Sequence, residues 1–177
     1  MAHVATPAAV KQDCARHHNS HTVKGITWRG VRREDARAVT ALVRRAVPHS
    51  GNWELTPRTR GIAAHTRHGA LLAVVLATEP RTASETPSLY LTVAVEANWH
   101  DAGLAMVGLN LIHGFLARRG IRAAVLFGTC ASREASLYLN AGYQVSKPHE
   151  PLLLPGTEVP MYSPKTYHPC WFFRRYE

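Results

Sequence analysis

The sequence is poor in the residues that hold small disulfide-rich or zinc-stabilised domains together. Its 177 residues include three cysteines, Cys14, Cys130 and Cys170, which lie far apart and form no C-x-x-C pair. An odd number of widely spaced cysteines predicts neither a disulfide framework nor a structural zinc site. We therefore expect free thiols and no bound metal.

Long apolar runs are also missing. The longest, near residues 70–77, is too short to span a bilayer, and residues 1–25 contain no continuous apolar core of the kind that a signal peptide has. Hydrophobic residues nevertheless make up 46% of the chain, enough for the core of one domain. These features predict a cytoplasmic, soluble protein without a membrane partner, with a flexible tail at 1–24 and one domain at 25–177.

Acidic residues are scarce. The chain has 12 aspartates and glutamates against 21 lysines and arginines, and its formal net charge is +9. Such an excess favours an anionic partner, which can be a phosphorylated cofactor, a nucleic acid or an acidic surface. The arginines are spread along the chain, so the charge alone does not distinguish these partners.

Hydrophobic periodicity indicates an α/β domain. Helical patterns alternate with apolar strand patterns in the second half of the chain, which predicts a mixed sheet with helices on both faces. The expected strands are 25–31, 61–68, 70–79, 88–97, 121–129, 142–148 and 171–176, and the expected helices are 34–47, 103–119 and 132–141. The apolar last strand also offers an edge that could pair with a second subunit in a homodimer.

The stretch WHDAGLAMVGLNLIHGFLARRG at 99–120 joins an expected strand to an expected helix through a turn of small residues. The first amides of a helix have no partner within it, and the helix dipole adds positive character there. Small residues such as Gly103 and Ala105 let an anion approach this backbone closely. The turn therefore predicts a site for a pyrophosphate.

Two motifs occur in a familiar order. H-x-x-G-x-A runs from His100 to Ala105, and one helix and one strand later the chain reads ASLYLNAGY at 135–143. Together they resemble the R/Q-x-x-G-x-G/A turn and the "LY…GF/Y" element of the GNAT superfamily of N-acyltransferases. The resemblance covers about residues 25–146. It implies a mixed, mostly antiparallel sheet of six to seven strands flanked by helices on both faces.

The resemblance also implies an activity and a donor site. The activity is direct transfer of an acyl group, first of all acetyl, from an acyl-CoA such as acetyl-CoA to the amine of a small molecule. The backbone at Val93 and Val95 would bind the pantetheine arm, where strand 88–97 separates from strand 121–129, and Tyr138 would protonate the leaving thiolate. The pyrophosphate would lie on the backbone of His100, Asp101, Ala102, Gly103, Leu104 and Ala105.

The acceptor site is less defined. We assign Trp53, Glu54, His65 and Tyr90 to substrate binding, because the region after the first helix lines the acceptor pocket in the family. No carboxylate lies in the middle of strand 88–97, so the sequence identifies no general base.

Two other functions fit the same residues. Some GNAT-fold enzymes take the acyl group from aminoacyl-tRNA, and the many arginines would suit a tRNA partner. A GNAT-fold module that has lost catalysis and only binds an anionic partner is the third possibility.

Overall fold

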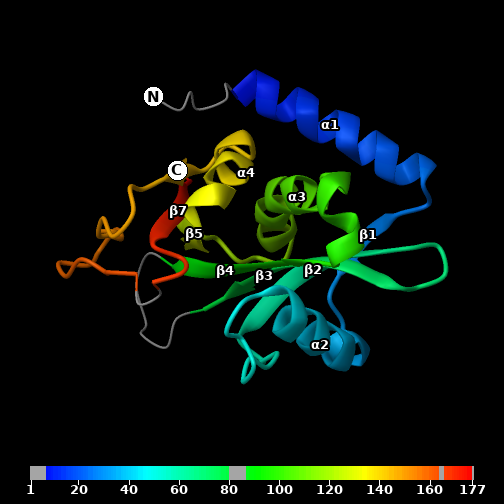
Figure 1. Ribbon diagram of the computed structural model, residues 1–177, viewed down its shortest axis with the longest axis horizontal. Coiled ribbons are helices and arrows are strands. Elements are labelled where there is room, and N and C mark those ends of the chain that lie inside the picture. Colours follow the sequence, from blue (N-terminus) through cyan, green and yellow to red (C-terminus); the bar gives the residue numbers. More distant parts are fainter. Residues whose placement is uncertain (1–6, 80–86, 164–165, 177) are drawn as a thin grey trace.

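A computed structural model of the chain describes residues 7–79, 87–163 and 166–176, and its centre is one seven-stranded sheet (Figure 1). The strand order is β1-β2-β3-β4-β5-β7-β6, and only β4 and β5 pair in parallel. The strands are β1 (Thr27–Gly30), β2 (Thr59–His65), β3 (Leu71–Thr78), β4 (Ser88–Val95), β5 (Val125–Cys130), β6 (Gln144–Val145) and β7 (Cys170–Arg175). The predicted mixed, mostly antiparallel sheet is confirmed.

Helices cover both faces of this sheet, as predicted. Helix α2 packs on one face, and α1, α3 and α4 lie on the other (Figure 1). The helices are α1 (Pro7–Val23), α2 (Ala36–Ala46), α3 (Leu104–Arg118) and α4 (Ala135–Asn140), with 3-10 turns η1 (Arg33–Asp35), η2 (Ala97–Ala102) and η3 (Ser132–Glu134). Within the described ranges, no helix is long and apolar enough to cross a membrane.

Helix α3 packs very close to the sheet. Leu104, Leu109, Ile112 and Leu116 are all completely buried. A Cβ added at Gly108 would lie 2.6 Å from the Cγ2 atom of Val75, so a larger residue would push the helix away from β3. Close approach of the helix to the sheet therefore outweighs the cost in helix propensity of a glycine in mid-helix.

The predicted flexible tail is wrong for Pro7–Val23, which form α1 and pack against α3. The Nε2 atom of His21 donates a hydrogen bond to the carbonyl oxygen of Ala102 at 2.7 Å, and its side chain is almost completely buried. The Nε1 atom of Trp28 donates to the other ring nitrogen of His21 at 3.4 Å. The helix shows no apolar period in the sequence because one of its few buried side chains is a histidine.

The last strand is partly covered at its outer edge. β7 pairs with β5 from Cys170 to Arg175 and with the two-residue strand β6 at Phe172 and Phe173. The short β6 thus occupies the middle of the edge that a second subunit would use. The homodimer stays a prediction.

Strands β4 and β5 pair over a short length and then separate. Their register joins Ser88–Tyr90 to Val125–Phe127, and no pairing follows although both strands continue. Gly128 lies at the point of separation, where an added Cβ would lie 2.8 Å from the carbonyl oxygen of Leu91 and even closer to the ring of Phe172. The missing side chain lets β4 and β7 approach β5 at the start of the gap.

Changing Gly128→Ala should lower the free energy of unfolding by about 1–3 kcal/mol, because the new methyl group has no room beside Phe172. The control is Gly114→Ala in α3, where an added Cβ meets only a flexible arginine end at 3.4 Å. That change should raise the free energy by up to about 1 kcal/mol, because alanine favours the helix. Urea unfolding of both variants measures the change in the free energy of unfolding. Equal changes in the two variants would refute the close approach of Phe172 to Gly128.

Candidate active site

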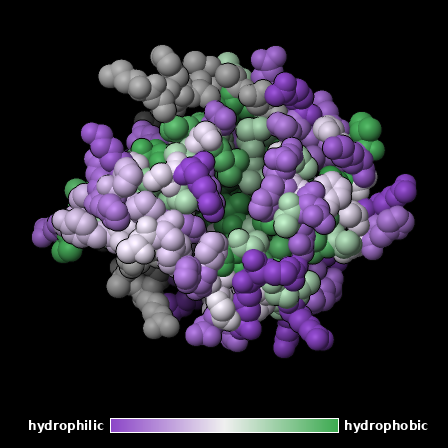
Figure 2. Space-filling view, in the orientation of Figure 1, coloured by the Kyte–Doolittle hydropathy of each residue, from purple (hydrophilic) through white to green (hydrophobic). Residues whose placement is uncertain are grey.

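The gap between β4 and β5 opens into a cavity of about 710 Å³. Side chains alternate across a strand, so Tyr90 and Thr92 lie on the α2 face of the sheet while Leu91 and Val93 lie on the α3 face. All four line the same cavity, which therefore crosses the sheet. Figure 2 shows hydrophobic residues gathered in a hollow at the middle of the molecular face, bordered by hydrophilic side chains.

The backbone of β4 presents unpaired polar groups to this cavity. The N–H of Glu96 donates to the carbonyl oxygen of Leu72 at 2.8 Å. The peptide groups of every second residue of β4, counted back from Glu96, therefore point toward β3. Those of Leu91, Val93 and Val95 point the other way, toward the gap. The carbonyl oxygen of Val95 accepts a hydrogen bond from the Nε2 atom of His100 at 3.2 Å, whereas Val93 has no strand partner on this side.

The turn before α3 has the predicted form. Gly103 has a φ of 69°, in the left-handed region, which turns the chain from η2 into α3. The amide of Val107 donates to the carbonyl oxygen of Gly103, so the earlier amides of Leu104, Ala105 and Met106 have no partner within the helix. Gly103 and Ala105 line the cavity.

Helix α1 supports this turn from behind. His21 binds the carbonyl oxygen of Ala102, and the ring of His17 lies so close to Gly103 that an added Cβ would come within 2.8 Å of its Cε1 atom. His100 lines the cavity but binds Val95, so its predicted contact with a phosphate stays a prediction. Asp101, Ala102 and Leu104 do not line the cavity, so their predicted backbone contacts with a pyrophosphate stay predictions.

Tyr138 lines the cavity from α4. Its ring stacks on Phe172, with centroids 3.8 Å apart, and only 6% of the residue is exposed. Burial raises the pKa of Tyr138 well above its usual value, and the nearby Cys130 and Glu134 raise it further. The phenol is therefore protonated at neutral pH and holds a proton that it can donate.

Two of the four residues assigned to the acceptor line the cavity. Trp53 lies in the loop after α2, and the hydroxyl of Tyr90 forms a hydrogen bond with that of Thr129 at 3.1 Å. Glu54 lies outside the cavity, where it is exposed and forms an ion pair with Arg44 at 3.3 Å.

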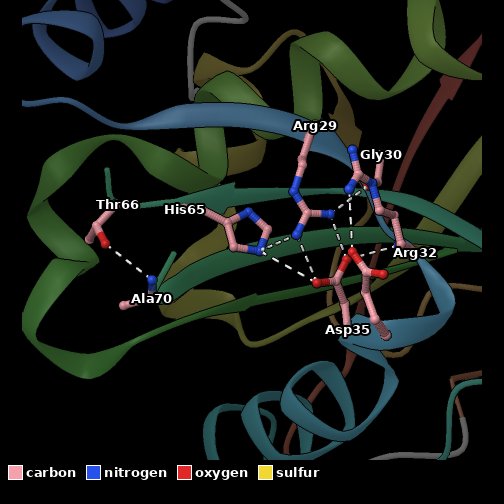
Figure 3. Close-up of polar contacts among 8 residues, drawn as sticks. Arg29, Gly30, Arg32, Asp35, His65, Thr66 and Ala70 are labelled. Carbon is pink, nitrogen blue, oxygen red and sulfur yellow. Dashed lines mark hydrogen bonds and ion pairs between the residues drawn. The ribbon is translucent and has the colours of Figure 1, made fainter. Parts of the chain in front are cut away.

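His65 also lies outside the cavity, at the β1 edge of the sheet, so its assignment to substrate binding is not supported (Figure 3). The Nη1 and Nη2 atoms of Arg29 donate to the two carboxylate oxygens of Asp35 at 2.6 and 2.8 Å, and Nη2 also donates to the Nε2 atom of His65 at 3.3 Å. These contacts join β1, β2 and η1. The bond from Arg29 lowers the pKa of Asp35 to about 2.

Four residues with titratable side chains line the cavity although no sequence motif marks them as candidates: His49, Glu79, Glu134 and His168. Glu134 could have been found from its spacing, because it lies four residues before Tyr138 and residues four apart share a helix face. No local pattern marks His168, which the chain brings to the cavity only by folding. The ring of His49 stacks on Tyr167 at 4.1 Å and so joins the loop after α2 to the loop before β7.

Similar solved structures identify the class of fold. An acetyltransferase of the GNAT family from Streptococcus pneumoniae is 14% identical, with a TM-score of 0.57 over 85% of this chain and 99% of that chain. The protein yncA from Salmonella typhimurium, solved with acetyl-CoA, is 13% identical, with a TM-score of 0.60 over 85% of this chain and 93% of that one. A probable N-acyltransferase from Enterococcus faecalis is 17% identical, with a TM-score of 0.52 over 67% of this chain.

The last match spans 32% of the Enterococcus chain, about a third of its length. No family model matches the sequence, and no curated protein matches it. At these identities the likeness concerns the fold, and it establishes that this chain has the GNAT N-acyltransferase fold.

Changing Asp35→Asn should lower the free energy of unfolding by about 2 kcal/mol at pH 7, because the arginine loses its charged partner. The pKa of Asp35 is lowered in the fold, so this contribution is present above about pH 4 and is lost as the pH falls toward 2. The control is Glu34→Gln, which removes an exposed ion pair with Arg32 and should cost less than about 0.5 kcal/mol. Urea unfolding of the wild type and both variants at pH 7 and pH 3 tests these expectations. If the free energy of unfolding differs between the wild type and Asp35→Asn by as much at pH 3 as at pH 7, the lowered pKa of Asp35 is contradicted.

Proposed function

We propose that this protein transfers an acyl group, first of all acetyl, from an acyl-CoA thioester to the amine of a small molecule. One observation carries the proposal: a single cavity is lined by Gly103 and Ala105 at the start of α3, by the free edge of β4 and by Tyr138. A similar fold has been solved with acetyl-CoA, which supports the choice of donor.

The chain provides complementary partners for each part of such a donor. The amides of Leu104, Ala105 and Met106, with the positive end of the α3 dipole, suit a pyrophosphate. Ala105, which lines the cavity at this point, has only a methyl group to obstruct that approach. The free N–H and C=O of Val93 match the amides of a pantetheine arm, which would continue the sheet where β5 has moved away.

The proposed chemistry needs no metal. The amine nitrogen attacks the thioester carbonyl, and the backbone amides of β4 that face the gap stabilise the oxyanion. When the intermediate collapses, the C–S bond breaks and the Tyr138 phenol gives its proton to the thiolate. The phenol is then restored by a proton from the new amide nitrogen.

The aminoacyl-tRNA alternative is less favoured by the cavity. RNA phosphates are held mainly by lysine and arginine side chains, and none of the described residues that line the cavity is a lysine or an arginine. The catalytically inactive alternative is tested by turnover.

Titration of the protein with acetyl-CoA in a calorimeter tests the donor site. We expect micromolar binding to one site, and Ala105→Glu should abolish it because this residue lines the cavity at the start of α3, where a carboxylate would repel the phosphates. Binding of tRNA without binding of acetyl-CoA would overturn the proposal in favour of aminoacyl transfer. Binding of acetyl-CoA without thiol release with any amine would support the inactive module.

Changing Tyr138→Phe should lower kcat by about 10²- to 10⁴-fold, the range expected for removal of a general acid. The dissociation constant of acetyl-CoA should stay within about threefold, because the ring and its stacking on Phe172 are kept. Thiol release and calorimetry measure the two quantities. A variant that loses donor binding and keeps kcat would show that Tyr138 has a structural role.

A further inference from the structure

The cavity lacks the basic side chains that dominate the chain. Lysines and arginines outnumber acidic residues by 21 to 12 overall. Among the described residues that line the cavity, however, there are two glutamates, Glu79 and Glu134, three histidines and no lysine or arginine. The acceptor that enters this cavity therefore meets two carboxylates and no lysine or arginine of the described chain.

The neighbouring arginines of α2 are engaged outside the cavity. Val43 and Ala46 of α2 line the cavity, and so does Val47, the residue after the helix. Arg44 and Arg45 do not line it. Arg44 pairs with Glu54, and Arg45 pairs with Glu96. Both guanidinium groups thus have carboxylate partners beyond the cavity wall.

The α2 side of the cavity combines aromatic, apolar and small polar side chains. Trp53 and Tyr90 contribute rings, and the stacked pair of His49 and Tyr167 links the two loops beside them. Ser50 and Asn52 in the loop after α2 add polar groups. The aromatic faces favour a flat body and also attract a cation.

Glu134 is the carboxylate best placed to hold the reacting nitrogen. It precedes Tyr138 by four residues, and both side chains line the cavity. Its Oε2 atom accepts a hydrogen bond from the amide of Ala131 at 3.1 Å, which fixes the carboxylate. Its Oε1 atom has no hydrogen-bond partner among the described residues.

We infer that the acceptor is a primary amine on an apolar or aromatic body, without a carboxylate or phosphate of its own, and that Glu134 binds its ammonium group. This inference rests on the proposed function. An ammonium gains a charged hydrogen bond at Glu134. A carboxylate on the same substrate would be desolvated near Glu79 and Glu134 without a described lysine or arginine in the cavity to pair with it.

The proton balance gives Glu134 a second task. Its carboxylate accepts one proton from the ammonium, which leaves a neutral amine with a free electron pair. That pair forms the N–C bond, and when the intermediate collapses the C–S bond breaks and Tyr138 protonates the sulfur. The nitrogen loses its next proton to the Tyr138 phenolate, so the products are the amide, the thiol and one proton on Glu134 that passes to solvent.

Matched pairs of acceptors test the inference. Thiol release from acetyl-CoA is measured with 2-phenylethylamine against phenylalanine, and with tryptamine against tryptophan, which differ only by the carboxylate. We expect kcat/KM to be at least about 100-fold higher for the two amines that lack it. Equal or better turnover of the amino acids, or no turnover of all four while acetyl-CoA binds, would overturn the inference and leave the donor site intact. Failure of acetyl-CoA itself to bind would instead refute the proposed function.

A variant tests the residue. Glu134→Gln keeps an oxygen for the Ala131 amide but loses the charge, so KM for 2-phenylethylamine should rise at least about tenfold while acetyl-CoA affinity is unchanged. The pH–rate profile should also move to higher pH, because the variant depends on amine already deprotonated in solution. The other titratable groups that line the cavity, His49, Glu79, His100, Tyr138 and His168, are the same in both proteins. The control is Glu158→Gln, an exposed residue outside the cavity, which should match the wild type. An unchanged KM and pH profile in Glu134→Gln would overturn its assignment.

Discussion

The separation of β4 from β5 is the constraint on which the rest of the site depends. Both strands stay anchored after they part, because β4 keeps β3 as a partner and β5 keeps β7. The gap therefore leaves peptide groups unpaired on an otherwise complete strand. Buried peptide groups need hydrogen-bond partners, and a ligand that runs along β4 can supply them.

The same gap brings together two faces of the sheet that a continuous sheet would keep apart. The α3 face carries the helix amides and Tyr138, and the α2 face carries Tyr90 and the loop with Trp53. A donor on one face and an acceptor on the other can meet through the opening. Gly128, which lacks a side chain at the start of the gap, makes this arrangement compatible with close packing of Phe172.

Local sequence signals predicted most of the fold and the turn that precedes α3. Strand and helix periods located the sheet and three helices, and small residues at Gly103 and Ala105 marked the turn. Helix α1 was missed because its burial depends on polar contacts such as His21 with Ala102. The acceptor side was less predictable, since it depends on which way β2 and the loops turn: His65 points to Arg29 and Asp35, while Glu134 enters the cavity.

The central claim is that the free edge of β4 and the start of α3 bind the donor, and amide chemical shifts measured by NMR during titration with acetyl-CoA test it most directly. The account predicts large shifts for the amides of Val93, Leu104, Ala105 and Met106. The amide of Ala94, which faces β3 like that of Glu96, should change much less. Binding that leaves Val93 and the start of α3 unchanged, with shifts elsewhere in the chain, would contradict the account.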